Sequence, residues 1–253
     1  MGILDINNLS LKLDGIVVAD KINISIEKGT IAALIGPNGA GKTSLFNVIA
    51  GIEKPDEGEV VFEGKNIIGL RPNQICKLGI SRTFQAIKLF DNMSVLDNVM
   101  VGFHSRYDSS FFKDIFFRTK VQKIENLYKQ KAKELLKLVG LSNKEKYQST
   151  SLSYGQQRLL EICRSLASDP KLLLLDEPAA GMNENEKNEL IKIIKYIKNT
   201  GVTILVVEHD MKFISDIADM VYVVNFGKNL ASGDTKSVLN NQQVIDAYLG
   251  VDD

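Results

Sequence analysis

The sequence is short of several features, and each shortage narrows the possible functions. Positive charge is not in excess, since 31 Lys and Arg residues balance 31 Asp and Glu residues. This balance argues against a protein that binds nucleic acid through a broadly basic surface. No run approaches the roughly 18–20 apolar residues that a membrane-spanning helix needs. The amino-terminal residues also lack the basic-then-apolar pattern of a signal peptide, so we expect a soluble, cytoplasmic chain.

Cysteine and histidine are equally scarce. Cys76 and Cys163 lie far apart without a CxxC spacing, which favours free, buried thiols in a reducing compartment. The two histidines, His104 and His209, are too few for a His-rich metal cluster. Before Phe46 the chain contains no aromatic residue at all.

The remaining composition and its patterns predict an α/β protein. Hydrophobic residues make up 44% and charged residues 25% of 253 residues, as in globular proteins. Alternating apolar and polar residues between Leu4 and Ile26 predict strands with one buried face. Later apolar runs (LLLLD, TILVVEH and MVYVVN) alternate with helical patterns, which predicts a parallel sheet covered by helices on both faces. Between about Ser94 and Ala167 the strand patterns disappear, so we expect a helical insertion there.

A glycine-rich motif lies between the apolar run Ile31–Ile35 and a helical pattern at Thr43–Ala50. It matches GxxxxGK[ST] and consists of Gly36, Pro37, Asn38, Gly39, Ala40, Gly41, Lys42 and Thr43, with Ser44 next. Glycines at this spacing let backbone N–H groups surround a phosphate, and the helix start adds the positive end of its dipole. Lys42 can then reach the β- and γ-phosphates, and the Thr43 hydroxyl can bind Mg²⁺. The motif therefore predicts a nucleotide-binding P-loop.

Two adjacent acids end the apolar run Leu172–Asp176. A carboxylate at a strand tip beside a P-loop can hold Mg²⁺, which predicts this role for Asp176. Its neighbour Glu177 can polarise the attacking water as a general base. Lys42 and Asp176 are too far apart in the sequence for a minimal nucleotide kinase or small GTPase, and no NKxD base-reading motif is present.

Further segments, in a fixed order, give the chain a family resemblance. They are Gln85 in RTFQ, Leu152-Ser153-Tyr154-Gly155-Gln156-Gln157, Ala180-Gly181-Met182-Asn183 and His209. In this order they resemble the Q-loop, signature, D-loop and switch histidine of ATP-binding cassette (ABC) ATPases. The resemblance implies one ABC ATPase domain over residues 1–253, of α/β class. Its expected parts are a RecA-like P-loop NTPase core with a parallel sheet, an N-terminal antiparallel β-subdomain and an α-helical subdomain inserted at about 86–168.

The resemblance also implies roles for single residues. Glu177, His209 and Gln85 are expected to be catalytic, and Thr43, Gln85 and Asp176 to hold Mg²⁺. ATP is expected to bind the P-loop of one subunit and Ser153, Gly155 and Gln156 of a second subunit. That second ATPase subunit would be a copy of this chain or a paralogue.

Two positions depart from the family pattern. Family members commonly stack adenine on an aromatic residue in the first strands, whereas here Leu13 or Val18 would supply an aliphatic face. We therefore expect looser discrimination between bases. Asn183 stands where many cassettes have Asp in the D-loop, which removes a charge from the expected dimer interface.

Several segments resemble one subfamily, the ATPases of branched-chain amino acid importers. They are RTFQ, LSYGQQRLLEICRSL, DEPAAGMN, VVEHDM, the insert Gly102–Glu125 and VIDAYLG. Urea and short-amide importers share most of them, and the lipopolysaccharide-export cassette is otherwise similar but shorter in the insert. A soluble ABC ATPase acting on nucleic acid or ribosomes is less expected, because the chain lacks a second cassette, long coiled coils and basic extensions. A nucleotide-binding regulator that does not hydrolyse ATP is disfavoured because Lys42 and Glu177 are both present.

The subfamily resemblance implies a set of partners. They are transmembrane permease subunits, the second ATPase subunit and, indirectly, a periplasmic or extracellular binding protein, with no nucleic acid. The chain would then lie peripherally on the cytoplasmic face of the cell membrane and be soluble when isolated. Phe111–Phe117 holds four phenylalanines, which would form local core or contact a permease loop or the bilayer surface.

Overall fold

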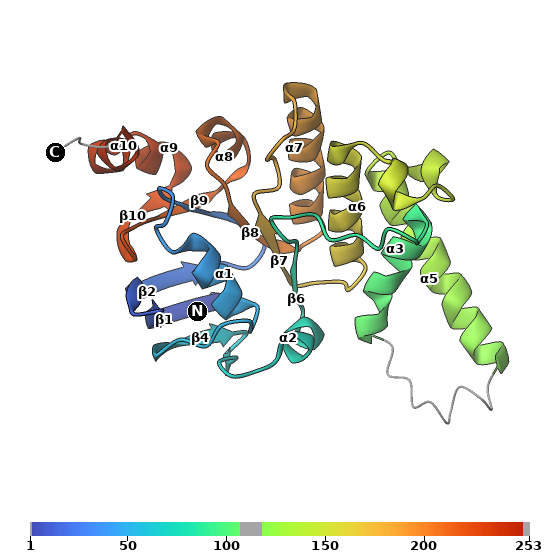
Figure 1. Ribbon diagram of the computed structural model, residues 1–253, viewed down its shortest axis with the longest axis horizontal. Coiled ribbons are helices and arrows are strands. Elements are labelled where there is room, and N and C mark those ends of the chain that lie inside the picture. The colour runs from blue at the N-terminus through green and yellow to red at the C-terminus, as the bar shows by residue number, and fades with distance from the viewer. Residues whose placement is uncertain (1, 107–117, 250–253) are drawn as a thin grey trace.

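The computed structural model describes residues 2–106 and 118–249, so the Phe111–Phe117 cluster lies outside the described residues. The chain is arranged around two sheets (Figure 1). The first is antiparallel, in the order β2-β1-β4-β5, and the second has the order β10-β9-β3-β8-β7-β6. Their strands are β1 (Leu4–Leu13), β2 (Ile16–Ile26), β3 (Ile31–Ile35), β4 (Glu57–Phe62), β5 (Lys65–Asn66), β6 (Ile80–Arg82), β7 (Leu172–Asp176), β8 (Thr203–Val207), β9 (Met220–Asn225) and β10 (Lys228–Asp234).

The second sheet is mixed and not wholly parallel. Strands β9, β3, β8, β7 and β6 pair in parallel, but β10 pairs antiparallel with β9. The predicted parallel core is confirmed for the apolar runs that form β7, β8 and β9, and β10 is an additional antiparallel edge strand that was not predicted. The segment Lys228–Asp234 (KNLASGD) has only two hydrophobic residues and no buried one, so no apolar run marks it as a strand. Its backbone hydrogen bonds to β9 place it there.

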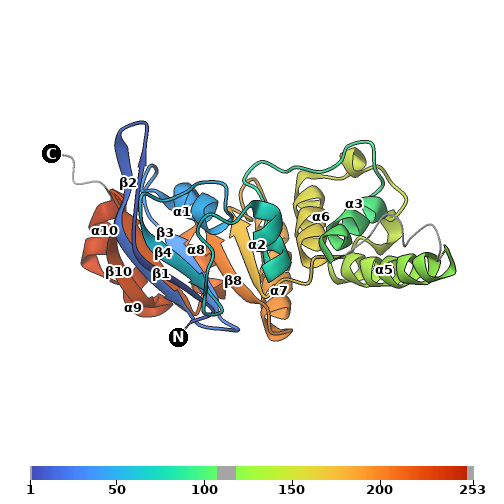
Figure 2. The same cartoon turned by 90° about the horizontal axis from the view of Figure 1, so that it is seen from below.

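The helices lie on both faces of the second sheet and at one end of the molecule (Figures 1 and 2). They are α1 (Lys42–Ile49), α2 (Pro72–Leu78), α3 (Val95–Gly102), α5 (Arg118–Leu138), α6 (Tyr154–Leu166), α7 (Glu184–Asn199), α8 (Met211–Ile217), α9 (Thr235–Leu239) and α10 (Gln242–Leu249). Short 3-10 turns cover Phe103–Arg106, Ser142–Lys144 and Ser149–Ser151. In both views the antiparallel sheet and the pair α3 and α5 lie at opposite ends.

Two hydrophobic clusters explain why the central strands are apolar at every position. All five residues of β3, β7 and β8 are buried. In β7, Leu173 and Leu175 belong to a cluster with helices α6, α7 and α8, whereas Leu172 and Leu174 belong to a cluster with α1 and the antiparallel sheet. Because successive side chains of a strand point to opposite faces, a sheet covered on both sides needs apolar residues throughout.

The helical region between β6 and β7 is held by packing of α3 and α5 with α6. Phe103 and Tyr128 stack with ring centroids 4.7 Å apart, which joins the end of α3 to α5. Cys163 of α6 is buried and Cys76 of α2 is half-buried, and both are free thiols. Within the described part of the chain, no helix has the length and apolar character required to cross a membrane.

Candidate functional site

The P-loop connects β3 to α1, and two of its glycines are required by close backbone contacts. A Cβ atom on Gly36 would lie 2.1 Å from the Val224 carbonyl oxygen, and one on Gly41 would lie 2.1 Å from the Val18 carbonyl oxygen. Gly41 also has φ 97, a left-handed conformation that side chains disfavour. The loop is thus wedged between β2 and β9, which sets its curvature.

The amino-terminal end of α1 is suited to an anion. Gly41 is its N-cap and supplies no side-chain hydrogen bond, so the first N–H groups of the helix keep their bonding capacity for a ligand. Thr43 is exposed and Ser44 half-buried in the first turn, and Asn38 and Gly39 are exposed in the loop, whereas Ala40 is buried. The exposure of these residues leaves the start of α1 accessible to a phosphate group.

Lys42 lies across the loop that precedes it. Its Nζ donates hydrogen bonds to the carbonyl oxygens of Gly36 at 2.6 Å and Pro37 at 2.8 Å. Burial lowers the pKa of Lys42, and the negative charges of Glu177 and Asp176 oppose that shift. The ammonium group, the P-loop and the two acids therefore share one site.

Asp176 ends β7 and is almost completely buried. Its Oδ2 accepts a hydrogen bond of 2.8 Å from Arg82 at the end of β6, and Arg82 also donates to Asn47 Oδ1 of α1 at 2.6 Å. The sequence analysis missed Arg82, although it stands in the RTFQ segment. Of the two carboxylate oxygens of Asp176, only Oδ2 accepts a hydrogen bond from a described residue, so Oδ1 remains for a cation or its water. The carboxylate and the exposed Thr43 hydroxyl are the oxygen ligands that Mg²⁺ prefers.

Gln85 and Glu177 are brought together although they lie far apart in the sequence. Gln85 Nε2 donates to Glu177 Oε2 at 3.1 Å. Glu177 has φ 45, a conformation uncommon for a residue with a side chain and often found at functional sites. Its backbone N–H donates to the Val207 carbonyl oxygen of β8 at 2.9 Å, which anchors this residue beyond the carboxyl end of β7.

His209 follows β8, and its side chain is 62% exposed. Its position depends on the preceding residue, Glu208, which the sequence analysis did not identify. The buried Glu208 carboxylate accepts hydrogen bonds from the backbone N–H of His209 at 3.1 Å and of Ala179 at 2.8 Å. Burial raises the pKa of Glu208, and these backbone hydrogen bonds oppose that rise. Glu208 thus ties the segment after β7 to the segment after β8.

The residues Ser153, Gly155 and Gln156 form the beginning of α6. Ser153 Oγ accepts from the Gln156 N–H, and Gln156 Oε1 accepts from the Ser153 N–H at 3.3 Å, which is a capping box. A Cβ atom on Gly155 would lie 2.6 Å from Glu186 Oε1, the end of a flexible side chain that would have to move aside. Among the hydrogen bonds of residues 2–106 and 118–249, none joins this segment to the P-loop.

Asn183 is the N-cap of α7. Its Oδ1 accepts from the Glu186 N–H at 3.0 Å, and its own N–H donates to Glu186 Oε2 at 3.0 Å. Ser, Asn and Asp are all good caps, so the departure from Asp at this position leaves the start of α7 intact.

The hairpin of β1 and β2 carries the aliphatic residues expected to face a base. Leu13 and Val18 are half-buried against the core, and the Val18 carbonyl lies against Gly41. Ile16 and Val17, at the same hairpin, are 68% and 47% exposed. The sequence analysis did not select these two, although exposed β-branched residues near a P-loop are candidates for apolar contact with a base.

Comparison with known proteins agrees with this arrangement. The profile of the family described as ABC transporter matches residues 19–180. The Escherichia coli (strain K12) high-affinity branched-chain amino acid transport ATP-binding protein LivG is 38% identical over 98% of both chains. A probable branched-chain amino acid transport ATP-binding protein of Archaeoglobus fulgidus is 37% identical over 100% of this chain and 97% of its own length.

A solved structure supports the same fold. The crystal structure of the ADP conformation of an ATP-binding cassette of an ABC transporter superposes with a TM-score of 0.86, at 33% identity, and covers 99% of each chain. The predicted α/β fold and the family resemblance are therefore confirmed. The chain belongs to the ABC transporter family, and its two sheets and helices form an ATP-binding cassette.

Proposed function

We propose that this chain hydrolyses ATP to power an ABC importer for branched-chain amino acids. The observation that carries the enzymatic part is the contact between Gln85 and Glu177 at the end of β7, beside Asp176 and close to Lys42. The transported class is supported by relatives that are branched-chain amino acid transport ATP-binding proteins and match almost the whole chain.

The residues divide the reaction between them. The P-loop amides and Lys42 bind the phosphates, and His209 hydrogen-bonds the γ-phosphate. Glu177 accepts a proton from the attacking water, whose oxygen bonds to the γ-phosphorus while the bond to the β,γ-bridging oxygen breaks. ADP and inorganic phosphate leave. Thr43, Asp176 and Gln85 would hold Mg²⁺, which would supply positive charge that stabilises the phosphate groups.

A second cassette completes the site in this proposal. The signature residues Ser153, Gly155 and Gln156 belong to α6, whereas the P-loop belongs to β3 and α1 at some distance from it (Figure 1). The exposed helix start at Ser153 would bind the ATP held by a second subunit, either a copy of this chain or a paralogue. Aliphatic contacts of the base with Leu13 and Val18 would accept adenine with weak discrimination.

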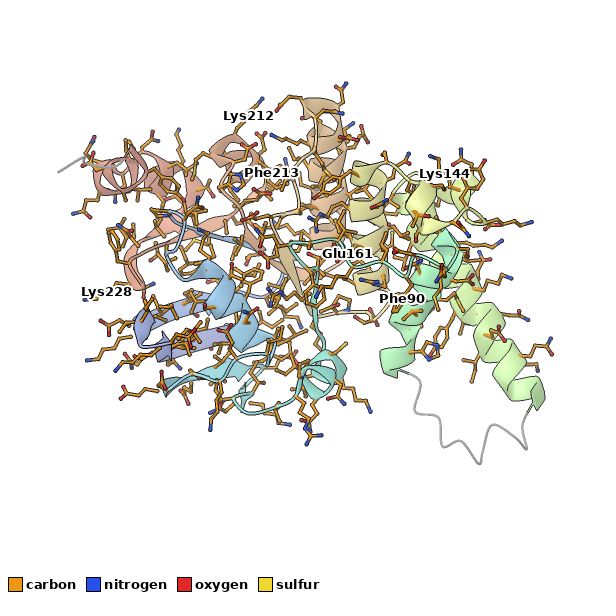
Figure 3. The ribbon with its side chains drawn as sticks, in the orientation of Figure 1. Phe90, Lys144, Glu161, Lys212, Phe213 and Lys228 are labelled. Carbon is orange, nitrogen blue, oxygen red and sulfur yellow. The ribbon has the colours of Figure 1, made fainter. Side chains whose placement is uncertain are left out.

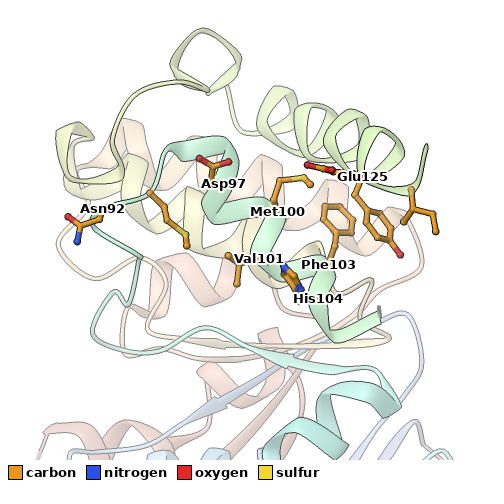
Figure 4. Close-up of a pocket in the computed structure, with 10 residues that line it drawn as sticks. Asn92, Asp97, Met100, Val101, Phe103, His104 and Glu125 are labelled. Atoms are coloured by element: carbon orange, nitrogen blue, oxygen red, sulfur yellow. The ribbon is translucent and has the colours of Figure 1, made fainter. Parts of the chain in front are cut away.

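Attachment to permeases at the cytoplasmic face of the membrane would use the helical region. A cavity of 520 Å³ lies between α3 and α5 (Figure 4). Its lining includes Met93, Met100, Phe103 and Tyr128, with Asp97 at its edge. Methionine side chains adapt readily to an inserted partner, so this cavity suits a permease segment. A binding protein outside the cell would deliver the amino acid to the permeases.

Uptake of labelled leucine tests the proposal. Cells that lack this chain should lose uptake and regain it with the wild-type chain but not with Glu177→Gln. The purified Glu177→Gln protein should bind ATP and be trapped as an ATP-bound dimer, and it should hydrolyse ATP about 10²–10⁴-fold more slowly because the general base is lost.

The catalytic role of Glu177 and the branched-chain assignment are overturned by different results. Wild-type turnover by Glu177→Gln would remove Glu177 as the base. Unchanged leucine uptake in the deleted cells would remove the branched-chain assignment, and urea and short amides would be measured next.

A further inference from the structure

A buried ion pair on α6 holds the backbone of the segment that contains Gln85. Arg158 and Glu161 are both fully buried, and Arg158 Nη1 lies 2.9 Å from Glu161 Oε2. The same nitrogen donates to the Phe84 carbonyl oxygen at 2.6 Å, and Nη2 donates to the Gln85 carbonyl oxygen at 2.7 Å. Glu161 Oε1 accepts from the Phe84 N–H at 3.3 Å. Figure 3 shows Glu161 between α6 and the six-stranded sheet.

A buried ion pair is an unfavourable way to fill the core, compared with apolar side chains. Two charges removed from water pay a desolvation penalty that apolar residues of similar volume avoid. Burial indeed raises the pKa of Glu161, against the opposing effect of Arg158. Phe84 and Gln85 lie beyond β6, and their backbone groups bond to these two side chains instead of to a sheet ladder. The charges thus provide hydrogen bonds that no apolar pair can offer to this loop.

The pair of Arg158 and Glu161 is linked to two other parts of the site, the side chain of Gln85 and the first turn of α6. Gln85 connects the pair to the proposed general base, because its side chain donates a hydrogen bond to Glu177. Tyr154, in the first turn of α6, accepts a hydrogen bond from Arg158 Nη2 on its hydroxyl at 3.4 Å. Its ring lies against Gly181, where a Cβ atom would come within 3.1 Å. The start of α6, the segment at Gly181 and the loop at Gln85 are therefore joined through Arg158.

We propose that Arg158 and Glu161 are positioning residues, which clamp the backbone at Phe84 and Gln85 to α6 and so set the distance between Gln85 and Glu177. A shift of α6, whose first turn is the proposed contact with the second subunit, then moves Gln85 with it. Closure of the two subunits would in this way adjust the contact with the base. The inference rests on the roles proposed above for Gln85 and Glu177.

The double variant Arg158→Met/Glu161→Leu removes the clamp and both charges of the fully buried pair, and it leaves Arg164 without its contact to Glu161. Replacement of a buried ion pair by apolar residues is often neutral or stabilising, but here it also removes hydrogen bonds to the backbone of Phe84 and Gln85, so the protein should fold with a melting temperature somewhat below wild type. The KM for ATP should stay within about twofold, and kcat should fall about 10–100-fold, because displaced groups near a reaction lose rate without losing ground-state binding. Hydrogen exchange at the Phe84 amide should become faster.

Arg164→Met is the matched control. Arg164 stands on the same helix and approaches Glu161 at 3.8 Å, but no hydrogen bond joins it to Phe84 or Gln85 among the described residues. Its kcat and the exchange rate at Phe84 should match wild type. A folded double variant with wild-type kcat and wild-type exchange at Phe84 would overturn the proposal.

If the double variant does not fold, Arg158→Lys is used to test the clamp. It keeps the charge but cannot present two nitrogens in the planar arrangement of a guanidinium group. Lower kcat with faster exchange at Phe84 supports the clamp, and wild-type values of both overturn it. Exchange at Phe84 is read without turnover, so it tests the clamp even if Glu177→Gln shows that the proposed base is wrong.

Discussion

The P-loop and the loop at Gln85 lie at the same site but are built in different ways. The P-loop uses backbone groups, and its shape depends on glycines at positions where a Cβ atom would meet a neighbouring strand. The loop at Gln85 is held by a long side chain, Arg158 of α6, which donates to the carbonyl oxygens of Phe84 and Gln85. Arg82, at the end of the preceding strand β6, donates to Asp176. A backbone cradle is rigid and local, whereas a loop held by side chains can follow the helix that holds it. The first suits binding of phosphate, and the second suits communication between subunits.

The largest effect on ATP binding is expected from Gly41→Ala, which changes the backbone of the P-loop. The new Cβ atom would lie 2.1 Å from the Val18 carbonyl oxygen, so the P-loop amides must shift by about 1 Å. A displacement of that size should weaken ATP binding by about 100-fold. Equilibrium binding of a fluorescent ATP analogue measures the loss.

Gly39→Ala tests whether the effect of Gly41→Ala comes from the steric clash with β2 or from backbone strain. Gly39 also has positive φ, 78, but nothing lies within 4 Å of its would-be Cβ atom. It should cost only the strain of a left-handed conformation, about 1–2 kcal/mol of folding free energy. Equal losses of ATP binding in both variants would show that strain, and not the contact with β2, sets the shape of the loop.

Arg82→Met breaks a side-chain support and is expected to act mainly on stability. It leaves the Asp176 carboxylate buried without its partner, which should lower the free energy of unfolding by about 3–5 kcal/mol. Urea denaturation of the nucleotide-free protein measures this value.

Lys171→Met is the exposed counterpart, since Lys171 pairs with Glu63 at the surface. Exposed pairs contribute less than about 1 kcal/mol. If the two variants lose the same stability, burial is not what makes the Arg82 pair important.

The smallest effect is expected from Leu13→Phe, which places an aromatic ring where it can stack on the adenine base of ATP. A stacking ring contributes about 0.5–1.5 kcal/mol beyond its burial, so the KM for ATP should fall several-fold. The ratio of the KM values for ATP and GTP in both proteins checks the prediction, and an unchanged KM would place the base away from this hairpin.

Much of the fold could be predicted because its signals are local. The apolar runs of β3, β7 and β8, the P-loop glycines and the capped start of α6 at Ser153 each follow from neighbouring residues. The strand β10 could not be predicted, since a polar edge strand has no apolar pattern.

For the candidate site, the sequence pointed to Gln85, Asp176, Glu177 and His209 but not to their supports. Arg82, Arg158 and Glu208 look like ordinary charged residues in the chain, and only burial turns them into fixed partners.

The sequence by itself determined which apolar segments form the central strands, where a phosphate can bind, and the family to which the chain belongs. These properties depend on the conformational preferences and spacing of residues that are close in the chain. The tertiary structure decided the order of the strands, the contact between Gln85 and Glu177, and the burial of Arg158 with Glu161. Such pairings join residues that are distant in the chain, and their free energy depends on the exclusion of water, which exists only once the layers have packed.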